Sequence, residues 1–176
     1  MPSPSLRPAA AADLPALHAL IERAYRGDRA RAGWTHEADL LGGQRTDQAA
    51  LTGMLADPLQ RLYVAEVDGA LVGCVSLLRK PGGVAYLGLL TVDPKRQAGG
   101  LGRAVLAAAE ERAVADLGAT RVEMTVIRQR AELIAWYERR GYAPTGEERA
   151  FPYGDKRFGI PAVPDLAFVV LDKRVG

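Results

Sequence analysis

Four stretches of the chain place apolar residues at the three- and four-residue spacing of an amphipathic helix. The first follows Asp13 as a candidate N-cap and ends at Gly27. The second follows Thr46 as a candidate N-cap and stops before Pro58. The third, "LGRAVLAAAEERAVADLG", ends in Gly118, and the fourth is the shorter stretch "AELIAWYERRG". The pattern therefore predicts four helices.

Apolar and β-branched runs outside these helices predict strands. "RLYVAEV" and "ALVGCVSLLRK" are joined by Asp68 and Gly69, which favour a tight hairpin because both tolerate positive φ. "PGG" at 81–83 then turns the chain into "VAYLGLLTV", which completes an antiparallel meander. Further strands are expected at "SLRPA", "TRVEMTVI", "YAPTGE" and "LAFVVLDK", with a loop over 151–164.

The order β-α-α-β-β-β-α-β-α-β-β is typical of an α/β protein with hairpins first and helical crossovers later. At 176 residues the chain has the length of one domain, since a division would leave two small halves. Apolar residues make up 48% and charged residues 25%, as in ordinary globular proteins. We expect a single domain over residues 1–176.

Charge and cysteine content narrow the function classes. Lys and Arg outnumber Asp and Glu by 23 to 21, which gives no argument for nucleic-acid binding. Cys74 is the single cysteine, which excludes an intramolecular disulfide framework and a zinc site built from cysteines. The chain has no signal-peptide pattern at its start and no apolar run of membrane-spanning length. We expect a cytoplasmic protein.

The stretch "VDPKRQAGGLGRAVL" at 92–106 places three glycines between an apolar strand and a long helix. The first N–H groups of a helix have no partner within it and lie at the positive end of the macrodipole. Glycines there let an anion approach the backbone, so a phosphate or pyrophosphate is the expected ligand. A plain tight turn into the helix stays open as the alternative.

Two other phosphate-binding patterns compete for this stretch. A Walker loop requires Lys and then Ser or Thr after the last glycine, and it is excluded because Arg103 and Ala104 follow Gly102. A dinucleotide fingerprint requires a third glycine at position 105, where this chain has Val105. The acidic residue that the fingerprint expects about 20 residues further on is present as Glu123. That alternative stays open, but it expects an all-parallel sheet in place of a hairpin meander.

The glycine stretch and its surroundings resemble the GNAT superfamily of N-acetyltransferases. The family signature Q/R-x-x-G-x-G/A matches Gln97, Gly100 and Gly102, and the V-x-P before it matches Val92 and Pro94. A further box, Y-E-x-x-G-F/Y, matches Tyr137, Glu138, Gly141 and Tyr142. The motifs occur in the family's order, within a matching order of elements over nearly the whole chain.

The resemblance implies a single-domain GNAT-like fold with a mixed, twisted central sheet of about six to seven strands, flanked by about four helices. The central strands would splay apart to admit acetyl-CoA as cosubstrate. Backbone groups of Leu90 and Val92 would contact its acetyl carbonyl and pantetheine. The backbone N–H groups around its pyrophosphate would be those of Gln97, Ala98, Gly99, Gly100, Leu101, Gly102 and Arg103.

In an acetyl transfer to nitrogen, an amine attacks the thioester carbonyl and a thiolate leaves. A tyrosine has an ordinary pKa of about 10, against about 8.5 for a thiol such as cysteine. It is therefore protonated at neutral pH and can donate toward sulfur. The resemblance gives this role to Tyr137. The amine must lose a proton, and Glu123 is the expected base, with Glu66 and Glu37 as further candidates. The strand "VAYLGLLTV", which often carries the base in the family, has no acid.

Acceptor specificity is expected in irregular segments, which can vary without disturbing the core. Trp34 and Glu37 in "AGWTHEADLL" suit an aromatic-walled pocket for an amine, with an ordinary capped turn as the alternative. Tyr153 in "FPYGDKRFGIP" is the other candidate, with a subunit contact in a homodimer as its alternative. Arg130 stands where many relatives have an asparagine that binds the cofactor.

We therefore predict an N-acetyltransferase that transfers an acetyl group from acetyl-CoA to a primary amine by direct attack. The acceptor is a small molecule or a peptide, and no metal, nucleic acid or membrane is expected as a partner. A covalent intermediate is not expected, because Cys74 lies mid-strand without a helix terminus or basic pair to activate it. A CoA-binding regulatory or interaction domain without turnover and a dinucleotide-dependent oxidoreductase stay open as alternatives.

Overall fold

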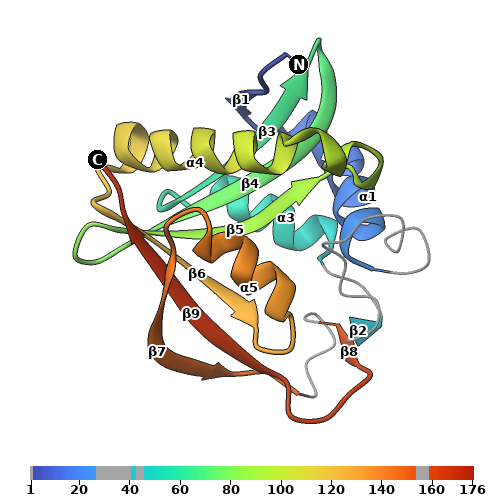
Figure 1. Cartoon of the computed structure of the whole chain (residues 1–176). Helices are drawn as coiled ribbons and strands as arrows, with labels where there is room; N and C mark the ends of the chain where they lie inside the picture. Colours follow the sequence, from blue (N-terminus) through green and yellow to red (C-terminus); the bar gives the residue numbers. More distant parts are fainter. Residues whose placement is uncertain (1, 27–40, 43–45, 154–158) are drawn as a thin grey trace.

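We describe the protein from a computed structural model, which defines residues 2–26, 41–42, 46–153 and 159–176 (Figure 1). The described residues form a seven-stranded sheet, a two-stranded sheet and four α-helices. The α-helices are α1 (Leu14–Tyr25), α3 (Gln48–Ala56), α4 (Leu101–Leu117) and α5 (Ala131–Glu138). Two 3₁₀ turns are η1 (Ala11–Asp13) and η2 (Pro94–Gly99). The strands are β1 (Ser5–Pro8), β2 (Leu41–Gly42), β3 (Gln60–Val67), β4 (Ala70–Lys80), β5 (Val84–Val92), β6 (Arg121–Ile127), β7 (Ala143–Ala150), β8 (Ile160–Pro161) and β9 (Ala167–Arg174).

The large sheet has the strand order β1-β3-β4-β5-β6-β9-β7. Its neighbours are antiparallel except β5 and β6, which run parallel and are connected through α4. The sheet is therefore mixed, as predicted, and not the all-parallel sheet that the dinucleotide alternative expects. Asp68 and Gly69 have φ angles of 52° and 77°, which confirms the tight hairpin between β3 and β4.

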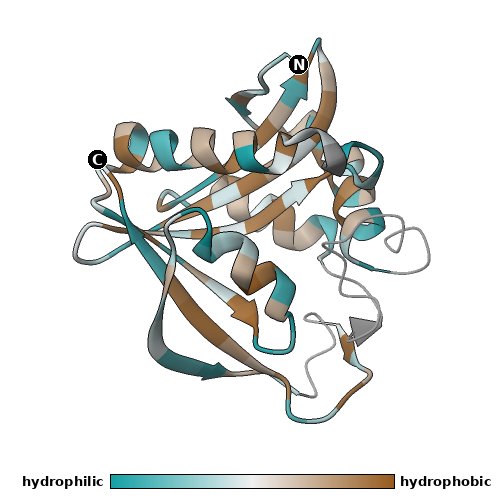
Figure 2. Ribbon diagram, in the orientation of Figure 1, coloured by the Kyte–Doolittle hydropathy of each residue, from teal (hydrophilic) through white to brown (hydrophobic). Residues whose placement is uncertain are grey.

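Helices cover both faces of the sheet: α4 and α5 lie on one face, and α1 and α3 lie on the other (Figure 1). Side chains of β3 alternate between the two faces, as the pleat of a strand requires. Tyr63 and Ala65 belong to the core under α4, whereas Leu62 and Val64 pack with α1 and α3. Figure 2 shows apolar residues concentrated along the central strands. The sheet thus separates two hydrophobic clusters.

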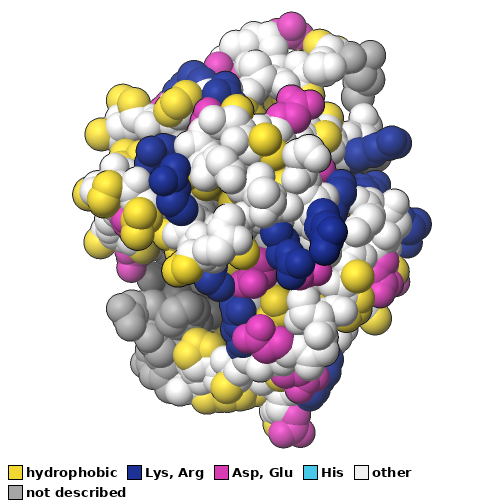
Figure 3. Space-filling view, turned by 90° about the vertical axis from the view of Figure 1, so that its left-hand side faces the viewer, with side chains coloured by type: hydrophobic (Ala, Val, Ile, Leu, Met, Phe, Trp, Pro, Cys, Tyr) yellow, Lys and Arg dark blue, Asp and Glu magenta, His cyan; other side chains and the backbone are white. Residues whose placement is uncertain are grey.

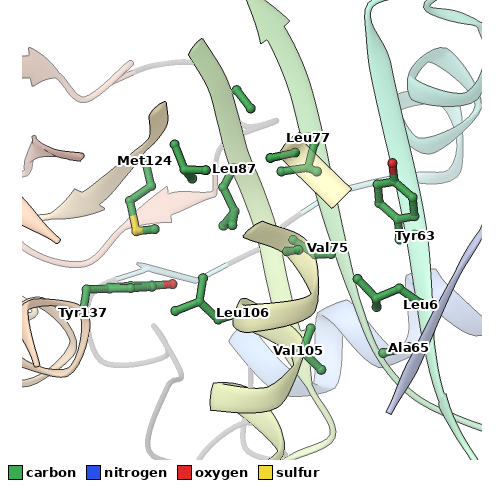
Figure 4. Close-up of a cluster of buried hydrophobic side chains, with 14 of the residues drawn as sticks. Leu6, Tyr63, Ala65, Val75, Leu77, Leu87, Val105, Leu106, Met124 and Tyr137 are labelled. Carbon is green, nitrogen blue, oxygen red and sulfur yellow. The ribbon is translucent and has the colours of Figure 1, made fainter. Parts of the chain in front are cut away.

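The larger cluster spans the width of the sheet. Figure 4 shows Leu6 and Tyr63 at one end and Met124 and Tyr137 at the other, with Leu106 of α4 between them. Tyr137 is thus a core residue as well as a motif residue. Its position relative to the sheet is fixed by packing.

Several element boundaries differ from the predicted ones. Helix α3 begins one residue later than expected, because Asp47 is its N-cap and accepts a hydrogen bond from the Ala50 N–H at 2.7 Å. The Thr46 N-cap prediction is therefore wrong. Asp13 precedes α1 as predicted, but its side chain makes no cap bond and pairs with Arg7. The segment 151–164, predicted as a loop, contains β8, which pairs with β2. The predicted stop at Gly27 lies outside the described residues.

Surface charges are mixed, in agreement with the near balance of acidic and basic residues. The face of the molecule seen in Figure 3 carries Lys and Arg side chains close to Asp and Glu side chains. Within the described ranges, no helix combines the length and hydrophobicity needed to cross a membrane.

Candidate active site

Strands β5 and β6 lie side by side at their beginnings and then diverge. The parallel ladder joins Val84–Tyr86 to Arg121–Glu123 and ends there. Just beyond the last pair, Tyr86 and Glu123, the hydroxyl groups of Tyr86 and Thr125 are 2.6 Å apart and share a hydrogen bond. Beyond them, the second halves of the two strands form the walls of an opening in the sheet.

A β-bulge in β5 lies beside this opening. The register between β4 and β5 shifts after Gly88, so that Leu89 and Leu90 together face a single residue of β4. Leu89 has a φ of 50°, which is uncommon for a residue other than glycine. Bulges re-aim backbone and side chains and often occur next to active sites. Here the bulge brings Leu90 to the opening, where its carbonyl accepts a hydrogen bond from the Tyr25 hydroxyl.

Two cavities extend from the opening and share four lining residues, namely Tyr25, Leu90, Leu133 and Tyr137. The strand cavity, of about 220 Å³, lies between β5, β6 and the end of α1. The glycine cavity, of about 90 Å³, leads along α5 to the start of α4. Besides the shared residues, the glycine cavity is lined by Val92, Gly100, Gly102, Arg103, Trp136 and Arg140. A ligand that filled both cavities would pass Tyr137 and Leu90.

Tyr137 lies buried at the junction of the two cavities. Its side chain is held by edge-to-face contacts with Trp136 and Tyr142, at ring-centroid distances of 5.0 and 5.7 Å. Burial, with a smaller contribution from Tyr25, raises the pKa of the Tyr137 hydroxyl well above its ordinary value, although Arg130 and Arg140 oppose the shift. The hydroxyl therefore stays protonated at neutral pH.

Gly100 sets the start of α4. It has a left-handed φ of 73°, and it ends η2 and begins α4. Its carbonyl accepts the first helical bond, from the Ala104 N–H at 3.1 Å. The N–H groups of the first turn, from Leu101 to Arg103, therefore have no partner within the helix. A Cβ at Gly100 would meet no atom of the described residues within 4 Å, so the space beside this helix terminus is open.

Asp93 anchors the chain just before the glycine stretch. Its carboxylate accepts hydrogen bonds from the Lys95 N–H and from the Arg23 guanidinium, both at 3.1 Å. Burial alone would raise the pKa of the Asp93 carboxyl, but these hydrogen bonds lower it below its ordinary value. Its own N–H donates to the Val72 carbonyl at 2.8 Å. The loop is thus attached to α1 and to β4.

Arg140 forms a cationic wall of the glycine cavity. Its guanidinium stacks on the Trp136 ring at 3.7 Å and donates a hydrogen bond to the Trp136 carbonyl at 2.7 Å. Burial, and then the charges of Arg139 and Arg103, lower the pKa of Arg140. Among the described residues, its Nε has no hydrogen-bond partner. An anionic ligand would relieve the repulsion in this group of arginines.

The predicted cofactor residues divide into three groups. Leu90, Val92, Gly100, Gly102 and Arg103 line the glycine cavity. The side chain of Leu101 belongs to the core, and Gly99 faces a separate surface hollow near the N-terminal segment. The side chains of Gln97 and Ala98 lie outside the described part of the chain.

Glu123, the expected base, is engaged in ion pairs. One carboxylate oxygen accepts from Lys80 at 2.8 Å and from Arg149 at 3.0 Å. Burial alone would raise the pKa of this carboxyl, but the two hydrogen bonds lower it below its ordinary value. Glu123 is also absent from the described lining of the strand cavity. This geometry favours a structural role, and the assignment as base stays a prediction.

The predicted acceptor residues lie elsewhere. Trp34 and Glu37 are outside the described residues. Tyr153 is half exposed, and its hydroxyl accepts from the Leu166 N–H, 13 residues further along the chain, at 2.6 Å. Of the described residues of the segment 151–161, Phe151 lines the strand cavity. Glu66 on β3, which like Glu37 is a further candidate base, is paired with Arg7 at 2.8 Å.

Three residues at the site escaped sequence reasoning. Tyr25 follows the apolar spacing of the first helix and was expected only to pack, yet its hydroxyl reaches β5. Arg26 follows the helix directly and lies 5% exposed in the wall of the strand cavity, although no motif marks it. Tyr86 occupies a position in the acid-free strand. A signal was available for Tyr86 alone, since it is the one residue with a titratable side chain in "VAYLGLLTV".

In the parts of the chain that the structure describes, no three His, Cys, Asp or Glu side chains are placed to hold a metal ion.

Comparison with solved structures finds many chains with this fold. The ribosomal-protein-S18-alanine N-acetyltransferase from Escherichia coli aligns with a TM-score of 0.70 at 17% identity, over 98% of this chain and 94% of that one. Ribosomal-protein-alanine N-acetyltransferase from Brucella melitensis aligns with a TM-score of 0.69 at 21% identity, over 97% and 99%. A GNAT family acetyltransferase from Elizabethkingia anophelis, solved with acetyl-CoA bound, aligns at 0.59 and 14% identity, over 73% and 84%.

Sequence comparison identifies the family. Curated protein sequences give no match. The family model described as acetyltransferase (GNAT) family matches residues 14–142. This range includes both splayed strands, the glycine stretch and Tyr137. The chain therefore belongs to the GNAT family of acetyltransferases.

Proposed function

We propose that the protein transfers the acetyl group of acetyl-CoA to a primary amine by direct attack. The observation that carries this proposal is the meeting of the two cavities at Leu90 and Tyr137. The glycine cavity ends at the N-terminus of α4, where the N-cap residue Gly100 has no side chain to cap the helix, and the strand cavity opens between β5 and β6. Two substrates that entered from these two directions would meet at the junction.

The glycine cavity suits the donor. The N–H groups at the start of α4, which have no partner within the helix, and the positive end of the helix macrodipole favour a pyrophosphate. Arg103 and Arg140 add positive charge along the same wall. Leu90, Val92 and Leu133 provide an apolar section between this wall and the junction, as an uncharged pantetheine arm requires.

The residues at the junction match the charge changes of the reaction. As the amine nitrogen bonds to the thioester carbon, negative charge grows on the carbonyl oxygen, and backbone N–H groups of the bulged strand can stabilise it. When the carbon–sulfur bond breaks, the Tyr137 hydroxyl can donate its proton to the sulfur and then recover a proton from solvent. The proton of the amine leaves through a base or a water chain. Glu123 is the base expected from the sequence, but its carboxylate is engaged by Lys80 and Arg149, which favours the water chain.

Two measurements test this function. Isothermal titration with acetyl-CoA and with NAD(H) should show binding of acetyl-CoA, and binding of NAD(H) without a response to acetyl-CoA would refute the transferase. A panel of amines should then be screened for acceptor-dependent release of the CoA thiol. Binding of acetyl-CoA without turnover on any amine would favour the regulatory CoA-binding alternative.

A further inference from the structure

A third cavity, which we call the arginine hollow, lies between the first half of α4, the end of α5 and β9, and has a volume of about 480 Å³. We propose that it binds the 3′-phosphate of CoA, so that the protein selects CoA over dephospho-CoA as carrier of the acetyl group. The inference rests on the proposed function, because it adds a second phosphate subsite for the same donor. The charged residues that line the hollow are Arg103, Glu110, Arg139, Arg140 and Lys173.

The charges of the hollow leave a positive excess. Its acidic side chain, Glu110, accepts hydrogen bonds from the Lys173 ammonium at 2.9 Å and from the Tyr142 hydroxyl at 2.9 Å. The negative charge of Glu110 is thus balanced by Lys173. Within the described ranges, none of the three arginines pairs with a carboxylate. The hollow therefore presents three guanidinium groups whose charge is available to an anion.

The three arginines act on one another. Arg139 is the C-cap of α5 and Arg140 follows it, while Arg103 comes from the first turn of α4, on the same face of the sheet (Figure 1). Burial, and then the charges of Arg139 and Arg103, lower the pKa of Arg140, as expected for guanidinium groups that lie close together. The negative end of the α5 macrodipole offsets part of this repulsion. An anion bound in the hollow would offset it more strongly, because it carries full charge.

The hollow continues from the proposed pyrophosphate site. Arg103 and Arg140 line both the hollow and the glycine cavity, so the two spaces share a wall. In CoA, the pyrophosphate is attached to the 5′ oxygen of the adenosine ribose, and a phosphate monoester is attached to the 3′ oxygen of the same ribose. A pyrophosphate at the start of α4 therefore leaves the monoester one ribose away, next to the hollow.

The guanidinium groups suit a phosphate monoester. Such a group carries about 1.5 to 2 negative charges at pH 7, and guanidinium binds phosphate oxygens through two parallel hydrogen bonds. Arg140 is held in place, because it stacks on the Trp136 ring at 3.7 Å and its Nη1 donates to the Trp136 carbonyl. Its Nη2 makes no hydrogen bond to a described residue and is left for a ligand. This placement before binding reduces the entropy cost of holding the phosphate.

Paired donors test the proposal. Isothermal titration gives the Kd for CoA and for dephospho-CoA, which keeps the pyrophosphate, the pantetheine arm and the adenosine and lacks only the 3′-phosphate. We expect the Kd for CoA to be lower by about tenfold or more, the effect of charge-assisted hydrogen bonds. The difference should shrink at high salt, because the hollow is open to solvent. Equal Kd values at low salt would overturn the proposal.

An arginine variant locates the effect. Arg139 lines the hollow but not the glycine cavity, so Arg139→Gln should raise the Kd for CoA by about threefold or more and the Kd for dephospho-CoA by less. Arg79→Gln is the control, because Arg79 is exposed on β4 and lines neither space. It should preserve the ratio of the two Kd values. A ratio in Arg139→Gln equal to that of the wild type would refute the placement of the 3′-phosphate in the hollow.

The same titrations separate this inference from the proposed function. Absence of binding by CoA and acetyl-CoA would refute the function. Equal Kd values for CoA and dephospho-CoA, together with acetyl transfer to an amine, would refute the inference alone.

Discussion

The hydroxyl of Tyr25 on α1 donates a hydrogen bond to the carbonyl of Leu90 on β5, across 65 residues of sequence. Leu90 is part of the bulge beside the opening in the sheet, so its orientation is not fixed by a regular ladder. The bond connects the end of α1 to the strand that would face the acetyl carbonyl. It therefore assigns Tyr25 a positioning role.

We expect Tyr25→Phe to lower kcat by about tenfold, the effect of losing one partly buried hydrogen bond. The KM for acetyl-CoA should change little, because Arg103, Arg140 and the N-terminus of α4 are unchanged in the glycine cavity. Steady-state kinetics with a fixed acceptor measures both values. An unchanged kcat would show that the bulge keeps its geometry without the hydrogen bond from Tyr25.

Tyr137→Phe removes the hydroxyl that we assign to protonation of the sulfur. Because general acid catalysis contributes about 10²–10⁴-fold, we expect kcat to fall by about 10²-fold while the Kd for acetyl-CoA stays within a factor of about three. Since burial raises the pKa of this hydroxyl, the wild-type rate should not fall between pH 7 and 9 through ionisation of Tyr137. Turnover equal to wild type would remove Tyr137 from the acid role.

Tyr142→Phe is the matched control for Tyr137→Phe. Tyr142 packs edge to face on Tyr137, but its hydroxyl donates to Glu110 at 2.9 Å and does not line either cavity. The variant should lose some thermal stability with its hydrogen bond and should retain kcat. A similar loss of kcat in both variants would point to packing as the cause.

Gly100→Glu should disrupt binding of acetyl-CoA, because it places bulk and negative charge at the proposed pyrophosphate site. Gly118→Glu is the control, since Gly118 caps the other end of α4 with a similar left-handed φ of 63°. Both variants should lose about 1 kcal/mol of stability through backbone strain. Only Gly100→Glu should raise the Kd for acetyl-CoA, by more than about tenfold. Isothermal titration of both folded variants decides this, and normal affinity in Gly100→Glu would refute the pyrophosphate assignment.

Much of the fold was predictable because its signals are local. Asp68 and Gly69 determine their hairpin through backbone conformation alone, and the α4 termini follow from Gly100 and Gly118. Position 47 shows the limit of such signals, since Thr46 and Asp47 are both good N-caps and the sequence does not choose between them.

The site was less predictable because its parts meet only through tertiary structure. The motif residue Tyr137 was identifiable, whereas Tyr25 and Arg26 reach the site from a helix whose pattern indicates only packing. Glu123 shows the opposite case, because an isolated acid in a strand suggests a base. Its partners Lys80 and Arg149 come from other strands and are not adjacent in sequence.

Glu123→Gln tests the predicted base directly. Because Glu123 is paired with two cations and its pKa is lowered, we expect kcat to stay within about threefold of wild type and the melting temperature to fall, since two part-buried cations lose a partner. Thermal unfolding and kcat over a range of pH give both results. A fall in kcat of about 10²-fold, together with loss of the acidic limb of the pH profile, would establish Glu123 as the base.

Asp13 should make the stability of the protein depend on pH. The Arg7 guanidinium binds both oxygens of this carboxylate, at 2.8 and 2.9 Å, and the Ala10 N–H donates to it at 2.7 Å. These bonds, that of Arg7 first, lower the pKa of the Asp13 carboxyl from 3.8 to about 2. Since the folded pKa is the lower one, the unfolded chain takes up the proton first as the pH falls. The stabilisation is therefore complete above about pH 5 and is lost between about pH 4 and 2.

Asp13→Asn should lower the melting temperature by about 2–4 °C at pH 7, corresponding to about 1 kcal/mol for a pair that is partly open to solvent. The difference from wild type should shrink when both are measured at pH 3. Asp172→Asn is the control, because Asp172 pairs with an Arg121 side chain that is 45% exposed and should contribute little. Differential scanning calorimetry at the two pH values gives the comparison. A difference between wild type and Asp13→Asn that is the same at both pH values would show that the lost contact is not electrostatic.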